Sequence, residues 1–247
     1  MDWGMDLCTS ISMLRITVFP PAGLSEIPQA GGATGSYSTT FPTTENPISE
    51  GGIWQTRDAS NFSTWSFAPF TSGGRAFGNA SSSGVQDAPA FLKPSVGILP
   101  TQTLTGVVFY NGSGVGSAEV ELHVRSSWNS TQIFSYELDI VYPSNFCQVV
   151  KWQGNNGSFT ILPNTGGTTG TLTPVVNGDT FVFSVTGLGA TVSFVVKQNG
   201  TTVCTADDTT AISGNAPYTS GSCGIGFDDG GAQNSNLGWE SFSAVSS

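Results

Sequence analysis

Residues 191–204 read TVSFVVKQNGTTVC, and this stretch decides the fold of the chain. Val192, Phe194 and Val196 alternate with other residues, so their side chains share one face of an extended strand. Asn199-Gly200 follows the strand. A two-residue type I′ turn needs a positive φ at both central positions, which Asn and Gly adopt readily. The stretch therefore predicts a β-hairpin.

Two further stretches, residues 118–125 and 180–185, alternate in the same way. In the first, Val120, Leu122 and Val124 share one face and polar side chains share the other, which predicts a half-buried strand. No stretch keeps the 3.6-residue apolar period of a helix. The polar side chains of the first stretch are those of Glu119, Glu121, His123 and Arg125.

The whole pattern predicts an all-β fold in which two antiparallel sheets form a β-sandwich of jelly-roll type with minimal helix. From Ser36 onward, β-rich runs and turn clusters recur at roughly the 8–12-residue spacing of sandwiches. A single sandwich can use all 247 residues. We expect residues 1–35 to form an N-terminal arm or edge segment, and residues 36–247 to form the sandwich domain.

The charge pattern excludes two classes of partner. The formal net charge is −10, and none of the seven Lys and Arg residues is adjacent to another. Binding to a nucleic acid duplex or an anionic membrane needs a cationic run or face, so neither is expected as a partner. No segment reaches the about 20 apolar residues of a membrane span.

The composition favours a protein that works outside a cell or on a virion surface. Only 10% of the residues are charged, and Gly, Ser, Thr and Asn fill the gaps between apolar runs. Asp2 and Asp6 stand where a signal peptide carries bases, so no Sec signal is predicted. Release by lysis, as for virion proteins, would reconcile these two observations.

Seven short motifs follow one another along the chain, at residues 46–54, 136–141, 147–154, 157–162, 177–179, 223–227 and 236–242. Their order resembles the concanavalin A-like lectin/glucanase superfamily, especially its laminin-G-like members. The resemblance covers residues 36–245 and implies two antiparallel sheets, one of them concave. The superfamily includes lectins, glycoside hydrolases, polysaccharide lyases and non-catalytic adhesion or virion domains, so it leaves the function open.

Glu137 and Asp139 are candidate catalytic carboxylates. They lie two residues apart on one predicted strand, so their side chains share a face. The glucanase branch carries three carboxylates on one such strand, and the resemblance places the third at Val141 or Tyr142, neither of which is an acid. Retaining hydrolysis needs a second carboxyl at about 5–5.5 Å. The favoured interpretation is therefore a solvated strand face.

His123 and Arg125 are candidates for a lyase site. A polysaccharide lyase can pair a His base with an Arg that neutralises a uronate. The two residues share the predicted polar face of 118–125, beside Glu119 and Glu121. His123 is the single histidine of the chain. A surface location on the strand is the plainer interpretation.

Aromatic side chains are the candidates for carbohydrate binding, because sugars stack their C–H patches on flat apolar faces. Trp128 lies in the predicted loop 126–130 and is the best exposed candidate, with Tyr110 and Tyr142 as further ones. Core positions are predicted for the tryptophans within β-rich runs, which are Trp54, Trp152 and Trp239.

Asp228-Asp229 and Asp207-Asp208 are candidate calcium ligands, since Ca²⁺ takes six to eight oxygens. Turn formation explains paired Asp equally well, so the cofactor prediction is none or Ca²⁺. Four cysteines form no CxxC motif. Cys204 and Cys223 are the best candidates for a disulfide, because each lies in a strand-like run and one loop separates them. Buried free thiols are the alternative.

The leading hypothesis is a non-catalytic surface or adhesion module that binds glycan or packs onto a larger assembly, such as a virus or phage particle. Its expected partners are a glycan or a capsid or cell-surface assembly, and a homo-oligomer is compatible with it. One rival is a glycoside hydrolase or polysaccharide lyase. A purely structural virion component whose sandwich binds only protein is the other.

Overall fold

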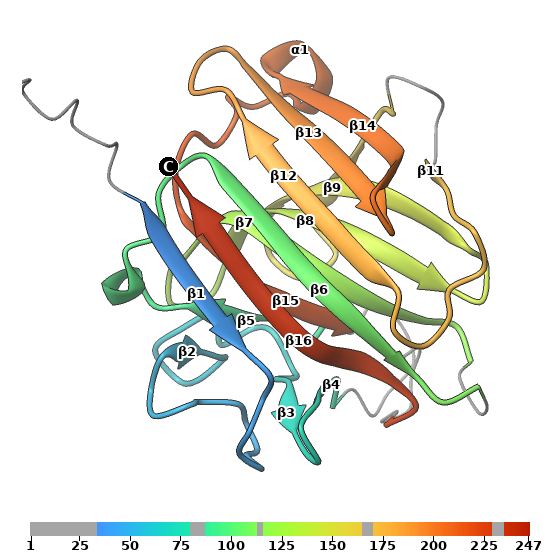
Figure 1. Ribbon diagram of the computed structural model, residues 1–247. Coiled ribbons are helices and arrows are strands. Elements are labelled where there is room, and N and C mark those ends of the chain that lie inside the picture. The colour runs from blue at the N-terminus through green and yellow to red at the C-terminus, as the bar shows by residue number, and fades with distance from the viewer. Residues whose placement is uncertain (1–33, 80–86, 113–115, 165–169, 229–234) are drawn as a thin grey trace, which may run out of the picture. The chain divides into compact units, whose positions relative to one another are not determined.

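A computed structural model describes residues 34–79, 87–112, 116–164, 170–228 and 235–247 (Figure 1). The predicted arm of residues 1–35 therefore lies outside the described residues except for its last two. Gly35 begins the first strand, which pairs with the last one along its whole length. No helix in these ranges is long and apolar enough to cross a membrane.

The described strands form two antiparallel sheets, and Figure 1 shows one layered over the other. In the first sheet, called sheet A, the strands run in the order β14-β13-β12-β6-β16-β4-β3, and β1 also pairs with β16. Its strands are β1 (Gly35–Thr39), β3 (Phe70–Thr71), β4 (Ala76–Phe77), β6 (Gln102–Tyr110), β12 (Thr180–Thr186), β13 (Thr191–Gln198), β14 (Thr201–Thr209) and β16 (Leu237–Ser246).

The second sheet, called sheet B, has the strand order β10-β9-β8-β7-β15-β5-β2, with β11 also pairing with β9. Its strands are β2 (Trp54–Gln55), β5 (Ala90–Leu92), β7 (Ala118–Trp128), β8 (Ile133–Tyr142), β9 (Phe146–Gly154), β10 (Phe159–Leu162), β11 (Gly170–Thr171) and β15 (Ser222–Asp228). The described helices are the one-turn α1 (Thr210–Ser213) and the 3₁₀ segment η1 (Pro94–Val96). The predicted all-β sandwich with minimal helix is confirmed.

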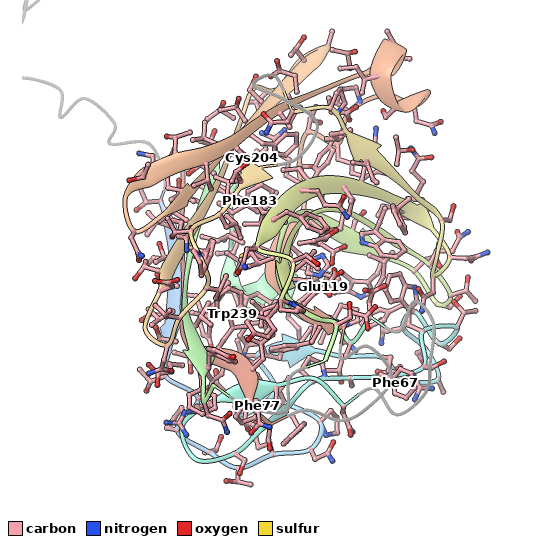
Figure 2. All side chains as sticks on the ribbon, turned by 90° about the vertical axis from the view of Figure 1, so that its right-hand side faces the viewer. Phe67, Phe77, Glu119, Phe183, Cys204 and Trp239 are labelled. Atoms are coloured by element: carbon pink, nitrogen blue, oxygen red, sulfur yellow. The ribbon has the colours of Figure 1, made fainter. Side chains whose placement is uncertain are left out.

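The hairpin predicted at residues 191–204 is present as β13 and β14. Asn199 and Gly200 have φ angles of 50° and 83°, as a type I′ turn requires. Inward-facing residues of both sheets fill the space between the layers, where Figure 2 shows Phe183 and Trp239. The predicted core positions of Trp54, Trp152 and Trp239 are also confirmed, because each is at most 3% exposed.

A second apolar cluster covers part of the face of sheet B that points away from sheet A, called the outer face. Phe91, Ile133, Val150 and Trp152 project from the sheet on this side. Segment 56–69 covers them with Phe62 and Trp65, both fully buried. The predicted solvated strand face is wrong, because Glu137 and Asp139 on the same face are 1% and 5% exposed. Period-two alternation shows which side chains share a face and cannot show whether that face is buried.

The predicted Cys204–Cys223 disulfide is also wrong, because both cysteines are free and buried. The Cys204 thiol on β14 contacts Cys147, which lies on β9 of the opposite sheet. Cys223 lies on β15, three strands along sheet B from β9. Three strand spacings of about 4.8 Å amount to about 14 Å, which no disulfide spans.

Candidate functional site

Ionisable side chains gather on the outer face of sheet B, next to the second apolar cluster. A small pocket of about 90 Å³ opens among them. Figure 2 shows Glu119 on the side of sheet B that faces away from the interlayer core. The group, called the acid cluster, consists of Asp87, Glu119, Glu121, His123, Glu137, Asp139 and Asp228.

Strand pairing explains why the acid cluster forms. In the ladder between β7 and β8, Glu121 lies opposite Asp139 and His123 lies opposite Glu137. Side chains on directly opposed residues stand about 4.5–5.5 Å apart at Cβ, so two short alternating stretches meet on one face. On the other side of β7, Gly226 of β15 lies opposite Glu121. The absence of a side chain there leaves space beside the Glu121 carboxyl.

Strand pairing places further carboxyls beside Glu137 and Asp139, although positions 141 and 142 of the same strand carry none. Glu137 and Asp139 are joined by Glu121 and Glu119, which come from the neighbouring strand β7. The glucanase pattern places all its acids on a single strand, so a search along β8 alone missed this partner. The alternation of residues 118–125 could have revealed this partner, because it identifies a polar face on β7. Pairing of β7 with β8 places that face beside the polar face of β8.

Burial and mutual repulsion dominate the electrostatics of the acid cluster. Burial, and then the nearby Glu137 carboxylate, raises the pKa of Glu121 well above its usual value. The same two causes raise the pKa of Asp139 and Asp87. Burial, followed by Glu137 and Asp228, raises the pKa of Glu119 to about 8. Without a counter-cation, this cluster must therefore hold protons at neutral pH.

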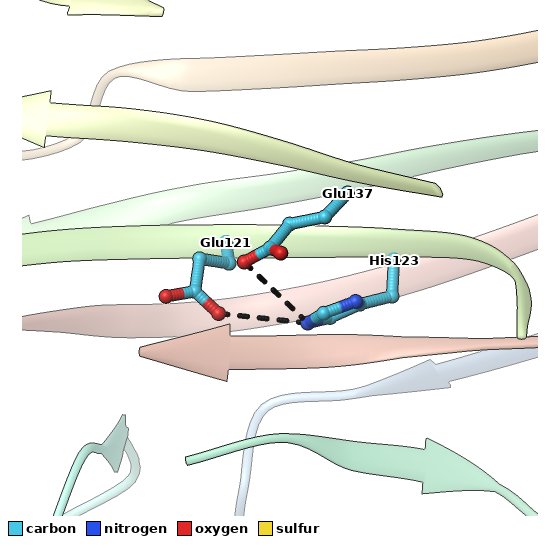
Figure 3. A group of neighbouring side chains, drawn as sticks. All are labelled: Glu121, His123 and Glu137. Atoms are coloured by element: carbon cyan, nitrogen blue, oxygen red, sulfur yellow. Dashed lines mark ion pairs between the residues drawn. The ribbon is translucent and has the colours of Figure 1, made fainter. Parts of the chain in front are cut away.

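His123 is fully buried, and burial lowers its pKa, which favours the neutral imidazole. Its Nε2 lies 3.5 Å from Glu121 Oε2 and 3.9 Å from Glu137 Oε1 (Figure 3). The ligating atoms of these three residues lie within 4.8 Å of one another. Trp152 Nε1 donates a hydrogen bond to the other oxygen, Glu137 Oε2. This trio could hold a metal ion.

Arg125 does not share a face with His123, so the predicted His–Arg pair is wrong. A β-bulge interrupts the pairing of β7 between Val124 and Ser127, and Arg125 has a φ of 51°. The extra residue shifts the alternation, so that Ser126 follows His123 on the outer face. Arg125 donates from Nε to the Pro100 carbonyl and from Nη1 to the Tyr218 carbonyl.

Of the predicted calcium ligands, Asp228 lines the pocket of the acid cluster, and Asp229 lies outside the described residues. Asp208 is engaged by Lys151 at 2.9 Å, inside the sandwich. Asp87 belongs to the pocket and was not singled out from the sequence. It precedes the short strand β5, and no local motif distinguishes it from a turn-forming Asp.

A separate groove of about 690 Å³ lies beside the C-terminal end of β7, and it is called the Trp128 groove. Trp128 ends the strand instead of lying in a loop, and its half-buried ring lines the groove. The indole stacks on Phe91 at 5.2 Å with an interplanar angle of 14°. Its Nε1 donates to Asn61 Oδ1 at 3.2 Å. Polar residues that also line the groove are Gln55, Asn61, Lys93, Ser95, Ser126, Ser127 and Ser222.

The other two aromatic candidates lie away from this groove. Tyr110 and Tyr142 contact each other through their hydroxyls, with ring centroids 4.7 Å apart. In the ladder of β7 and β8, Trp128 pairs with Ile133, whereas Tyr142 pairs with Ala118 at the opposite end. Nine residues of strand separate Ile133 from Tyr142, about 30 Å at 3.4 Å per residue. The three predicted aromatics therefore do not form one site.

Comparisons with known proteins agree on the fold. No protein-family model and no curated protein matches the sequence. A protein of unknown function with a galectin-like fold from Bacillus subtilis matches with a TM-score of 0.50 and 8% identity, over 84% of this chain and 94% of that chain. The jelly-roll sandwich fold that the sequence resemblance implied is thereby confirmed.

Two other solved structures are similar at lower scores. The carbohydrate-binding module CBM66 from Bacillus subtilis has a TM-score of 0.45 and 13% identity, covering 81% of this chain and 95% of that one. The CBM2 module of the evolved Dit protein of Lactobacillus casei BL23 phage J-1 has a TM-score of 0.46 and 11% identity. It covers 86% of this chain and 96% of that one.

Proposed function

We propose that this chain is a non-catalytic glycan-binding module and that the Trp128 groove is its binding site. One observation carries the proposal: a fixed indole ring lines a groove of about 690 Å³ among polar side chains. This volume falls within the about 300–1,000 Å³ typical of small-molecule sites. A groove of this size accommodates one or two sugar residues.

The arrangement around Trp128 suits a sugar ring. Phe91 covers one face of the indole, and Asn61 accepts its N–H, so the ring is held before a ligand arrives. A preorganised aromatic face loses little conformational entropy on binding. Lys93, Gln55 and Ser127 on the groove wall offer donors and acceptors to sugar hydroxyls. A sugar ring in the groove would then stack on the indole and form hydrogen bonds with the groove wall at the same time.

In this proposal the module is displayed outside a cell or on a larger assembly, such as a virus or phage particle. The low content of charged residues, 10%, and the formal net charge of −10 support display on an exposed surface. Association of the protein with purified particles or cell envelopes tests this part of the proposal separately from sugar binding.

A glycan array probed with the full chain tests the binding site. We expect Trp128→Ala to abolish binding of the glycan that the wild-type chain selects, and Trp128→Phe to retain part of it, because a flat ring remains. Tyr110→Phe is the matched control, since this aromatic residue lies at the other end of the strands and should bind as the wild type does. Unchanged binding by Trp128→Ala would defeat the assignment of the groove.

A polysaccharide hydrolase is the second candidate, and the proximity of Glu121 and Glu137 favours it. Two carboxyls beside one imidazole resemble an acid–base pair. In the part of the chain that the structure describes, the pocket that Glu137 lines measures about 90 Å³, well below the about 300 Å³ of the smallest usual ligand sites, and Glu121 does not line it. A hydrolysis screen over polysaccharides decides between the two, because turnover that Glu137→Gln abolishes would establish the enzyme.

A further inference from the structure

The acid cluster contains a group of acceptors that face one another without a donor between them. Within the described residues, no N–H or hydroxyl donor reaches either oxygen of the Glu121 carboxyl or Nε2 of His123, and the neighbour of Glu121 is another carboxyl, that of Glu137. All three atoms are completely buried. Buried polar groups without partners are rare in proteins, and each one implies an unseen ligand or a stored strain.

The hydrogen bonding of His123 determines what its Nε2 presents. Nδ1 lies 3.2 Å from Ser135 Oγ, whose own proton can go to the Tyr136 carbonyl at 3.1 Å. Ser135 Oγ can therefore accept from an N–H at Nδ1, which selects the Nδ1–H tautomer of the imidazole. The other nitrogen of a neutral imidazole is then a lone pair. In that tautomer the lone pair points towards one oxygen each of Glu121 and Glu137, and these oxygens repel it when both carboxyls are ionised unless a cation lies between them.

The spacing of the three groups fits a metal ion. Metal–ligand bonds of about 2.0–2.2 Å in a tetrahedron put neighbouring ligand atoms about 3.4 Å apart. Nε2 of His123 stands 3.5 Å from Glu121 Oε2 and 3.9 Å from Glu137 Oε1, and the whole set lies within 4.8 Å. These separations are too long for hydrogen bonds of ordinary strength. They match ligands grouped around a common centre (Figure 3).

Gly226 of β15 packs directly against two of the three groups. A Cβ added at this residue would stand 2.1 Å from Glu121 Oε2 and 2.6 Å from His123 Nε2. Any side chain here would displace both atoms. Glycine at position 226 thus allows the Glu121 carboxyl and the His123 imidazole to lie beside each other.

The neighbouring groups also resemble a metal site. The Nδ1 side of His123 is fixed by Ser135, and Trp152 Nε1 donates to Glu137, so two of the ligands have outer hydrogen bonds that orient them. Asp139, Asp87 and Glu119 are further carboxyls around the trio, and their pKa values are raised by burial and by the neighbouring carboxyls. A divalent cation would neutralise the charges of two ionised carboxyls at the place where they repel one another.

We propose that Glu121, His123 and Glu137 bind a divalent transition-metal ion such as Zn²⁺. An imidazole with two carboxylates suits zinc or a related first-row ion. Ca²⁺ takes six to eight oxygen ligands and is disfavoured by the nitrogen. This site is distinct from the Trp128 groove, and its role is to hold the outer face of sheet B together by binding three side chains of β7 and β8.

Isothermal titration of the EDTA-treated full chain with Zn²⁺, and separately with Ca²⁺, tests the site. We expect one equivalent of Zn²⁺ to bind and Ca²⁺ to bind more weakly. His123→Gln removes the nitrogen ligand and should weaken Zn²⁺ binding by at least about tenfold, the lower end of what the loss of an orienting partner costs a metal site. Glu240→Gln, a substitution at a half-buried carboxylate on sheet A that pairs with Arg75, is the matched control.

A second variant keeps the test decisive if His123→Gln does not fold. Gly226→Ala retains all three ligand residues, but its Cβ would stand 2.1 Å from Glu121 Oε2 and 2.6 Å from His123 Nε2, so it should displace both atoms and weaken Zn²⁺ binding as well. Substitution of Co²⁺ into the wild-type chain adds a spectroscopic readout, because its d–d absorption reports a four-coordinate site with nitrogen and oxygen ligands. No Zn²⁺ binding by the wild type, or equal binding by the folded variants, would overturn the proposal.

Discussion

At Arg125, a single residue changes the direction of every side chain that follows it on β7. Its φ of 51° belongs to the bulge that moves Ser126 to the outer face and turns the guanidinium to the carbonyls of Pro100 and Tyr218. The guanidinium thus satisfies carbonyls of two connecting segments and is not available to a ligand beside His123. A bulge of one residue therefore decides which polar groups meet in the acid cluster.

Lys151 is a second residue whose role depends on its surroundings. Its ammonium lies between the two sheets, fully buried, 2.9 Å from Asp208 of β14. It also donates to Ser213 Oγ and to the carbonyls of Asn215 and Ala216, at 2.9–3.1 Å. The ion pair links β9 of sheet B to β14 of sheet A and anchors the segment that follows α1.

We predict that Lys151→Met lowers the free energy of unfolding by about 3–5 kcal/mol, because it leaves the Asp208 carboxylate buried without its counter-charge. Combining it with Asp208→Leu should recover much of the loss. The half-buried pair of Arg75 and Glu240 is the control, and Glu240→Gln should change stability by less than about 1 kcal/mol. Urea denaturation measures all of them, and an equal effect at both pairs would contradict the prediction.

At the scale of the element, the turn between β13 and β14 tests the role of backbone conformation by itself. Gly200 has a φ of 83°, and no atom lies within 4 Å of an added Cβ. A substitution there therefore meets no neighbour, and only the left-handed backbone conformation opposes a side chain.

We expect Gly200→Ala to destabilise the protein by about 1–2 kcal/mol. Gly189, in the loop between β12 and β13, also has open space around its Cβ position but no positive φ. Gly189→Ala should therefore be neutral, or stabilising by up to about 1 kcal/mol through the unfolded state. Thermal unfolding of the two variants compares them directly, and equal melting temperatures would show that the turn conformation contributes nothing.

At the scale of the whole molecule, the described residues form two buried regions of different composition, one between the sheets and one on the outer face of sheet B. The space between the sheets is almost entirely apolar, with the Lys151–Asp208 pair as its buried ion pair in the described residues. The outer face of sheet B, in contrast, combines the acid cluster with the aromatic residues under segment 56–69. The apolar interior holds the fold together, and the ionisable outer layer makes its stability depend on pH.

We predict that, with metal ions chelated by EDTA, the free energy of unfolding falls as the pH rises from about 4.5 to 8. The folded chain keeps the Glu119 proton up to a pKa of about 8, whereas the unfolded chain releases it near the ordinary value of 4.5. This contribution is thus fully present below pH 4.5 and is lost by pH 8. The groups that face Glu119 are Glu137 of β8, Asp228 of β15 and Asp87.

Melting temperatures at pH 5 and pH 8 in EDTA measure this dependence. Glu119→Gln carries no titrating proton, so its melting temperature should change less between the two pH values than that of the wild type. An equal or steeper change in the variant would show that Glu119 is not held protonated in the folded state. Glu121, Asp139 and Asp87 shift in the same direction and explain the part of the slope that remains.

The local pattern of residues was sufficient to predict the all-β sandwich, the turn at Asn199-Gly200 and the buried positions of Trp54, Trp152 and Trp239. Alternation with a period of two shows which side chains share a face, and it placed Glu121 with His123 and Glu137 with Asp139 correctly. It also showed that β8 carries two carboxylates where the glucanase pattern has three.

What covers a face, and which strands lie side by side, was decided only by the tertiary structure. Phe62 and Trp65 reach the outer face of sheet B from a segment about 60 residues before it along the chain, counted to β7. The pairing of β7 with β8 brings Glu121 to Glu137, and the layering of the sheets brings Cys204 to Cys147 instead of Cys223. The physical reason is that alternation is a property of one strand, whereas burial, repulsion and ligand geometry depend on groups from several.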